Sequence, residues 1–180
     1  RAKRQELSSQ QQHDASEKFA KHFLKSDLFS RCNTFACYLA FDGELDLTPV
    51  IEAIWKKKKH CYLPVIDNDL LLFSLYKEDT TLKENKYKIP EPQSKELVGL
   101  HELDAILLPL TAFDQHNNRL GMGAGFYDRT LVSVKSSMMK ALTVMPTLIG
   151  VAHQCQAAEQ LPVDSWDVPL DMVITDKGKV

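Results

Sequence analysis

The stretch of this chain best suited to chemistry is residues 119–129, which read R-L-G-M-G-A-G-F-Y-D-R and follow an apolar run at 105–110. Glycine allows the backbone to turn tightly and lets another group approach it closely. A strand, a glycine-rich loop and a helix start together present unpaired N–H groups and partial positive charge, which suit a phosphate. Arg119 and Arg129 add fixed charge, and Asp128 is placed to meet a hard cation that accompanies the phosphate.

The spacing of these glycines differs from two common phosphate motifs. No Lys-Ser or Lys-Thr pair follows the last glycine, so the segment is not a Walker A motif, and the third glycine comes one residue too early for G-x-G-x-x-G. A plain tight turn explains the glycines alone equally well. The flanking Arg119, Tyr127, Asp128 and Arg129 favour a functional loop.

Carboxylates in the sequence D-G-E-L-D, residues 42–46, follow the end of an expected strand. The segment begins like a calcium loop but lacks the later ligands and the closing Glu, which excludes an EF-hand. For Asp42 and Asp46 we expect an ordinary acidic turn before a helix, where carboxylates suit the helix dipole. Glu44 is a functional candidate because this turn should lie on the ligand-bearing edge of the sheet.

Asp128 and Asp171 are far apart in the sequence but could converge on one Mg²⁺. A magnesium site usually takes one or two carboxylates and leaves the other positions to water and substrate phosphate. Each of these two residues could also have a purely structural role. Asp128 would complement the dipole of its helix, and Asp171 would simply enter a strand.

The apolar pattern predicts the elements that must position these residues. We expect helices at residues 9–25, 48–58 and 127–142, and strands at 34–41, 61–66, 70–76, 105–110, 147–152 and 172–175. Ser9 with Gln12 forms a capping-box pattern, and Thr48-Pro49 supplies an N-cap followed by a proline at the first helical position. Residues 77–100 are polar and are expected to form a long irregular connection, which is often a functional lid.

Strands that alternate with helices imply βαβ units and a mostly parallel sheet covered on both faces, and 180 residues suit one domain. Ligands of such folds gather at the carboxyl ends of the strands. We therefore expect the turn after Phe41, the glycine loop and the approach to Asp171 at one common edge.

Composition narrows the class of protein. The chain is 44% hydrophobic and 26% charged with a net charge of −2, which argues against a general nucleic-acid or membrane-surface binder. Four scattered cysteines without a C-x-x-C pair indicate neither a zinc knuckle nor a disulfide framework, and they fit a reducing compartment. We expect a cytoplasmic monomer that binds neither nucleic acid nor membrane.

Four segments resemble, in order and spacing, the family of 5-formyltetrahydrofolate cyclo-ligase, also called methenyltetrahydrofolate synthetase, in a bacterial form. They are residues 119–129, L-A-F-D-G-E-L-D at 39–46, I-P-E-P at 89–92, and L-P-V-D-S-W-D-V-P-L-D at 161–171. The resemblance covers nearly the whole chain, and R-L-G-x-G-x-G-[FY]-Y-D is its most specific part. It implies one domain over residues 1–180, a three-layer α/β/α Rossmann-like sandwich with a mostly parallel sheet.

The resemblance also implies an ATP- and Mg²⁺-dependent cyclisation of 5-formyltetrahydrofolate to 5,10-methenyltetrahydrofolate, with release of ADP and phosphate. A formamide oxygen leaves poorly, so its phosphorylation gives an activated imino-phosphate that the neighbouring N10 amine attacks. Ring closure benefits from proximity because both nitrogens belong to one molecule. The enzyme must align the γ-phosphoryl group with the formyl oxygen and stabilise the developing charge.

Carried over by position, the resemblance assigns catalytic roles to Glu44, Arg119 and Asp128. It makes Asp128 and Asp171 the magnesium ligands, and it places Leu39 and Glu44 in the folate pocket. Glu44 is the expected hydrogen-bond partner of the pterin or of the N10 region. ATP phosphates are assigned to Arg119 and to the backbone of Leu120, Gly121, Met122, Gly123, Ala124, Gly125, Phe126 and Tyr127. Substrate contacts from the loop are assigned to residues 122–126, where Phe126, with Tyr127, offers aromatic surface to a flat ring.

Two features depart from the family pattern. Many relatives have Gly or Lys at the position of Ala124, so a lysine contribution is missing there, and the methyl group needs a negative φ or some strain. The basic residues with which the family's first helix contacts ATP are expected upstream of Arg1. Lys3 and Arg4 continue that basic stretch, but no contact is assigned to them.

Two other functions remain open. A non-catalytic nucleotide- or folate-binding relative is one, although the retention of Glu44, Asp128 and Asp171 favours an enzyme. A sugar-phosphate isomerase or CoA-transferase-like enzyme on a similar framework is the other, and ATP-independent turnover would support it. A polyglutamate tail on the folate should meet a basic surface, for which the long connection offers Lys77, Lys83, Lys86 and Lys88.

Overall fold

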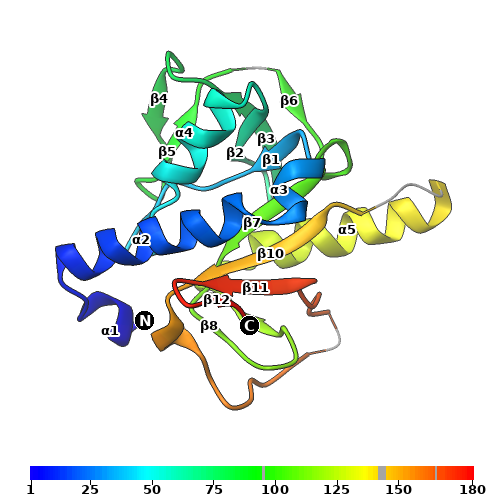
Figure 1. Ribbon diagram of the computed structural model, residues 1–180. Helices are drawn as coiled ribbons and strands as arrows, with labels where there is room; N and C mark the ends of the chain where they lie inside the picture. Colours follow the sequence, from blue (N-terminus) through cyan, green and yellow to red (C-terminus); the bar gives the residue numbers. More distant parts are fainter. Residues whose placement is uncertain (95, 142–144, 165) are drawn as a thin grey trace.

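The computed structural model describes residues 1–94, 96–141, 145–164 and 166–180. In this part of the chain, eight strands form the central sheet in the order β12-β11-β10-β7-β1-β2-β3-β6 (Figure 1). Their bounds are β1 Thr34–Ala36, β2 His60–Asp67, β3 Leu70–Tyr76, β6 Leu97–Val98, β7 Ala105–Pro109, β10 Thr147–Ala152, β11 Met172–Thr175 and β12 Gly178–Lys179.

The middle of the sheet is parallel and its edges are antiparallel. Strands β11, β10, β7, β1 and β2 pair in parallel with one another, in this order. Strand β3 returns antiparallel to β2 and then pairs with β6, while β12 turns back on β11. This arrangement confirms the expected mostly parallel sheet.

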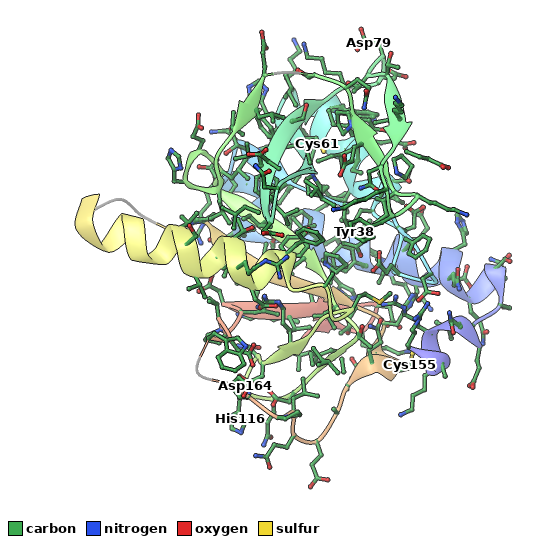
Figure 2. All side chains as sticks on the ribbon, turned by 180° about the vertical axis from the view of Figure 1, so that it is seen from behind. Tyr38, Cys61, Asp79, His116, Cys155 and Asp164 are labelled. Atoms are coloured by element: carbon green, nitrogen blue, oxygen red, sulfur yellow. The ribbon has the colours of Figure 1, made fainter. Side chains whose placement is uncertain are left out.

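Both faces of the sheet are covered by helices. Alternate residues of β7 show this directly, because Leu107 packs with α2 (Ser9–Leu24), α3 (Asp27–Arg31) and α4 (Thr48–Lys56), whereas Ile106 and Leu108 pack with Leu131 of α5 (Phe126–Ala141). Figures 1 and 2, which view the molecule from opposite sides, show these two layers on either side of the strands. The three-layer α/β/α prediction is confirmed.

The helix starts differ from those expected. The capping box of α2 is made by Ser8 and Gln11, one residue before the expected pair Ser9 and Gln12. Thr48 is not an N-cap but the first residue of α4, which follows Leu47. The carboxylate of Asp46 accepts a hydrogen bond from the Thr48 backbone N–H at 3.0 Å instead. Asp46 therefore has the structural role expected of an acidic turn.

The structure also differs from the expected helices in their ends and in one additional helix. A short helix, α1 (Ala2–Gln5), precedes α2, and no pattern in the sequence indicated it. Helix α4 ends at Lys56, because Lys58 adopts a left-handed φ of 57°. Helix α5 begins one residue before the expected Tyr127, and its expected end at Leu142 lies outside the described residues.

Two predicted segments were wrong in kind. The expected strand at 34–41 ends at Ala36, and three of the apolar residues after it, Tyr38, Leu39 and Phe41, line a cavity instead. The expected irregular connection at 77–100 contains a hairpin of β4 (Leu82–Glu84) and β5 (Pro90–Pro92), as well as β6. Proline discourages a strand prediction, but it is tolerated in a two-stranded ladder that has only edges.

Three of the four lysines expected near a polyglutamate tail lie on the β4–β5 hairpin, and Lys77 lies in the turn after β3. Lys83 belongs to β4, and Lys86 and Lys88 lie in the turn between the two strands. Their role toward a tail stays a prediction. Cys32, Cys37, Cys61 and Cys155 are free thiols. Among the described residues, no helix has the length and apolarity required to cross a bilayer.

Candidate active site

A cavity of about 410 Å³ opens at the carboxyl ends of β1 and β7. Its walls come from four parts of the chain: the connection from β1 to α4, strands β2 and β3, the β4–β5 hairpin, and the glycine loop. Tyr38, labelled near the centre of Figure 2, is buried in one of these walls and donates a hydrogen bond from its hydroxyl to the Leu45 carbonyl at 2.7 Å. The cavity is thus lined largely by apolar residues, with a few polar groups.

Most of the residues proposed from the sequence meet in this cavity. Its wall includes Leu39, Glu44, Arg119, Gly121, Met122, Ala124, Gly125, Phe126, Tyr127 and Asp128. Leu120, Gly123 and Asp171 are not part of the wall. The turn after Phe41 and the glycine loop therefore share one edge of the sheet, as expected.

The glycine loop follows a small hairpin that the sequence pattern did not reveal. Strands β8 (Ala112–Phe113) and β9 (Arg119–Leu120) pair after β7 and bring the chain back to the sheet edge. The loop then spans 121–125, and α5 starts directly at Phe126. The unpaired N–H groups of the first turn of α5 are consequently adjacent to the loop.

Two glycines of the loop are required by its backbone. Gly123 and Gly125 have φ values of 91° and 68°, a region that L side chains rarely adopt. A Cβ at Gly125 would also lie 2.8 Å from Nη1 of Arg129. Ala124, between them, is not among the residues with positive φ. Its methyl group is therefore accommodated without backbone strain.

Arg119, before the glycine loop, and Asp128, after it, form an ion pair in the cavity wall. Nη2 of Arg119 pairs with Oδ1 of Asp128, and Nη1 donates to the Val168 carbonyl at 2.6 Å. The side chain of Arg119 is 5% exposed and that of Asp128 is 32% exposed. Asp128 is thus held in the first turn of α5 with part of its carboxylate still open to the cavity.

Arg129 stabilises the loop through hydrogen bonds, so its guanidinium is already engaged with the protein backbone. Its Nη1 donates to the Ala124 carbonyl at 2.9 Å, and its Nε donates to the Asp69 carbonyl in the β2–β3 turn at 3.0 Å. Its guanidinium also stacks over the ring of Phe126 at 4.9 Å. Of the two flanking arginines, only Arg119 lines the cavity.

Arg4 is an important residue of the site that the sequence did not reveal. It is fully buried, and it donates from Nη1 to the Leu110 carbonyl at 3.0 Å and from Nε to the Asp42 carbonyl at 2.9 Å. Its Nη2 lies 3.2 Å from Oδ2 of Asp42 and 3.7 Å from Oε1 of Glu44. Because its partners are about 40 to 106 positions away in the sequence, no local pattern signals this burial.

Glu44 combines burial with a fixed orientation. Its Oε2 accepts a hydrogen bond from the Phe41 backbone N–H at 3.1 Å. Burial raises the pKa of Glu44 to about 6, although the Phe41 N–H and the Arg4 charge favour the ionised form. Burial, followed by the nearby charge of Glu44, also raises the pKa of Tyr127. A carboxyl group that titrates close to neutral pH is suited to accept or donate a proton.

The β4–β5 hairpin forms another wall of the cavity and meets the residue that follows the glycine loop. Oε1 of Glu91 accepts from the Ile66 backbone N–H at 3.1 Å and from the Asn85 amide at 2.7 Å. The ring of Tyr87 meets that of Phe126 edge-on, with centroids 5.8 Å apart. These residues were not proposed individually, although the expected lid and the I-P-E-P segment pointed to this region.

Asp171 does not lie where we expected it. It precedes β11, and its carboxylate accepts a hydrogen bond from the backbone N–H of Leu148, near the start of β10. This position is at the amino ends of the parallel strands, whereas ligands gather at their carboxyl ends. The expectation of a common edge was wrong for Asp171, because a residue that enters a parallel strand lies at the opposite edge from one that leaves it.

The part of the chain that the structure describes holds no preformed cluster of metal ligands. Within the described residues, no group of three or more His, Cys, Asp or Glu side chains could hold a metal ion. Asp128 alone fits a magnesium that takes its remaining ligands from phosphate and water.

The fold and the site together define a class of protein. An α/β protein with an anion-suited loop beside a largely apolar cavity can hold a phosphorylated ligand against a flat organic one. Comparison with known proteins agrees with this class. The model of the 5-formyltetrahydrofolate cyclo-ligase family matches residues 1–176, and the chain belongs to that family.

Individual relatives cover nearly the whole chain. The 5-formyltetrahydrofolate cyclo-ligase of Escherichia coli strain K12 is 38% identical over 180 residues, which span 97% of this chain and 95% of that protein. The one from Haemophilus influenzae is 40% identical over 172 residues, covering 93% and 88%. The solved structure of 5,10-methenyltetrahydrofolate synthetase from Aquifex aeolicus has a TM-score of 0.83 at 31% identity, covering 99% of this chain and 86% of that one.

The raised pKa of Glu44 predicts a pH-dependent cost to stability. The folded state holds this proton up to about pH 6, whereas an ordinary Glu releases it near 4.5. Stability should therefore fall by about 2 kcal/mol as pH rises through this window. Glu44→Gln lacks this titration, so its free energy of unfolding relative to the unmodified chain should rise by about 2 kcal/mol between pH 4 and pH 8. Urea unfolding at both pH values measures the difference, and parallel pH curves would contradict it.

Proposed function

We propose that this chain converts 5-formyltetrahydrofolate to 5,10-methenyltetrahydrofolate, with ATP converted to ADP and phosphate. The observation that carries the proposal is the meeting of the glycine loop, the Arg119–Asp128 pair and the buried Glu44 in one cavity. The loop suits a phosphate, and the apolar walls suit a flat pterin ring. Membership of the cyclo-ligase family supplies the reaction that joins these two ligands.

The reaction proceeds in two steps. The formyl oxygen first attacks the γ-phosphorus of ATP, which breaks the bond to the bridging oxygen of ADP and gives an imino-phosphate. N10 then attacks the formyl carbon, the phosphate leaves with the former formyl oxygen, and N10 loses its proton. Phosphoryl transfer needs mainly alignment and charge stabilisation, and the ring closure is favoured by proximity within one molecule.

The loop and Arg119 supply most of the alignment for the first step. The backbone N–H groups at the start of α5 and the guanidinium of Arg119 face negative charge that grows on the phosphoryl oxygens. Arg119 is already fixed by Asp128 and by the Val168 carbonyl, so it needs little reorganisation. A bound Mg²⁺ would neutralise phosphate charge, and Asp128 is the residue of the cavity that would hold it.

Glu44 is assigned to the second step. It lies beside Tyr127 and Arg4, on the same side of the cavity as the glycine loop, where N5 and N10 must lie if the formyl oxygen is to meet ATP. A carboxylate with a pKa of about 6 accepts a hydrogen bond from N10–H and takes its proton as the new C–N bond forms.

The direct test is the absorbance of the methenyl product after the protein is mixed with 5-formyltetrahydrofolate and MgATP. The proposal expects a rise that disappears when either ATP or Mg²⁺ is omitted. A rise without ATP would favour an isomerase-like reaction. Folate binding without any product, in the presence of both, would favour a binding protein and overturn the proposal.

Asp128→Asn tests the assignment at the loop, with Asp171→Asn as a matched control. We expect Asp128→Asn to lower turnover by about 100-fold or more, the scale of losing one charge-stabilising group in a transition state, while 5-formyltetrahydrofolate still binds. Asp171→Asn keeps an oxygen that can accept from the Leu148 N–H, so it should leave turnover within about twofold of the unmodified chain. Full activity of Asp128→Asn at ordinary Mg²⁺ would defeat the assignment.

A further inference from the structure

The cavity contains a second carboxylate, Glu91, whose surroundings differ from those of Glu44. Glu44 lies beside Arg4 and the Phe41 backbone, next to the glycine loop. Glu91 belongs to β5 of the hairpin and lies against β2. Neither the phosphoryl transfer nor the ring closure described above gives Glu91 a task.

The two oxygens of Glu91 are not equivalent. Oε1 accepts from both the Ile66 N–H at 3.1 Å and the Asn85 amide at 2.7 Å, which fixes the direction of the side chain. Oε2 has no hydrogen-bond partner in the part of the chain that the structure describes, although Glu91 lines the cavity and is only partly exposed. An oriented carboxylate with one unused oxygen in an apolar-walled cavity is suited to accept hydrogen bonds from a ligand.

The order of the strands separates Glu91 from Glu44. Glu44 follows β1, and Glu91 is bound to β2, which lies next to β1 in the sheet. The two carboxylates therefore line different parts of the cavity wall. A flat ligand that fills the cavity can meet both of them.

A pterin ring has matching chemistry at its two ends. N5 and the C6 side chain that carries N10 lie at one end, and the 2-amino group and N3–H lie side by side at the other. The latter pair are hydrogen-bond donors that point the same way, and a carboxylate is their natural acceptor. With N5 and N10 near the glycine loop, the amino edge points toward the hairpin.

We propose that Glu91 is a specificity residue that accepts hydrogen bonds from the 2-amino and N3–H edge of the pterin ring. The inference rests on the proposed function, because it uses the folate substrate of that reaction. Fixing Oε1 through Ile66 and Asn85 orients the carboxylate before the ligand arrives, which lowers the entropic cost of binding. Glu91 thereby selects 2-amino-pterins and sets which end of the ring faces ATP.

Glu91→Gln is the sharpest variant. Its amide oxygen can still accept from Ile66 and Asn85, while an NH₂ group replaces the free oxygen and opposes the donors of the ring. We expect the Kd and the KM for 5-formyltetrahydrofolate to rise by about tenfold or more, and the KM for ATP to stay within about twofold. Glu84→Gln, an exposed residue of β4 that does not line the cavity, is the matched control and should change neither value.

A second ligand makes the test independent of whether the variant folds. The unmodified chain should bind the 2-desamino analogue of 5-formyltetrahydrofolate about tenfold more weakly than the parent compound, and Glu91→Gln should lose this discrimination. Calorimetric titration without ATP measures both affinities. Equal affinity of the unmodified chain for the two ligands overturns the proposal without any variant.

The outcomes separate this inference from the proposed function. Normal ATP-dependent turnover, with Glu91→Gln indistinguishable from the unmodified chain, would overturn the role of Glu91 alone. Binding of 5-formyltetrahydrofolate without turnover would overturn the reaction, while the discrimination between the two ligands would still decide the role of Glu91. Absence of folate binding by the unmodified chain would contradict both.

Discussion

The buried guanidinium of Arg4 is the interaction on which the site most depends. A fully buried charge is costly unless its donors are satisfied, and Arg4 satisfies its own with the Asp42 carbonyl and carboxylate and the Leu110 carbonyl. These contacts join the first helix, the turn that carries Glu44 and the chain leaving β7. Removing the side chain would take the donor from the Asp42 carbonyl and would unlink these three segments, although the Asp42 carboxylate keeps Arg1 and Gln5 and the Leu110 carbonyl keeps Gln156. The cavity thus depends on a residue that need not contact substrate.

Around this centre, the cavity is arranged by the order of the strands. The parallel strands β7, β1 and β2 end at one edge, and each contributes a different function: an anion-suited loop, a carboxyl group with a raised pKa, and the wall that holds Glu91. The charged residues of the wall are few, and its many apolar residues suit the flat faces of a ring. Burial in this largely apolar cavity also raises the pKa of Glu44, so the walls that suit a flat ring also suit Glu44 to proton transfer.

How far the sequence predicted this structure depended on whether the signal was local. Strand positions such as 70–76, 147–152 and 172–175 were predicted to the residue, because continuous apolar runs bounded by turns have few alternatives. The glycine loop was found because its residues are contiguous. Arg4 and Glu91 were missed as site residues, since their roles come from partners on other elements. Asp171 was misplaced because it precedes its strand, and the start of a parallel strand lies at the opposite edge from the carboxyl ends where ligands gather.

Phosphorylation of the substrate's formyl oxygen beside the glycine loop is the step that would couple ATP to ring closure. The fate of that oxygen can be measured when 5-formyltetrahydrofolate labelled with ¹⁸O in the formyl group is converted in the presence of MgATP. We predict that the label appears in inorganic phosphate, in proportion to the methenyl product formed. Label released to water, with unlabelled phosphate, would show that ATP hydrolysis and cyclisation are separate events and would contradict phosphorylation of the formyl oxygen.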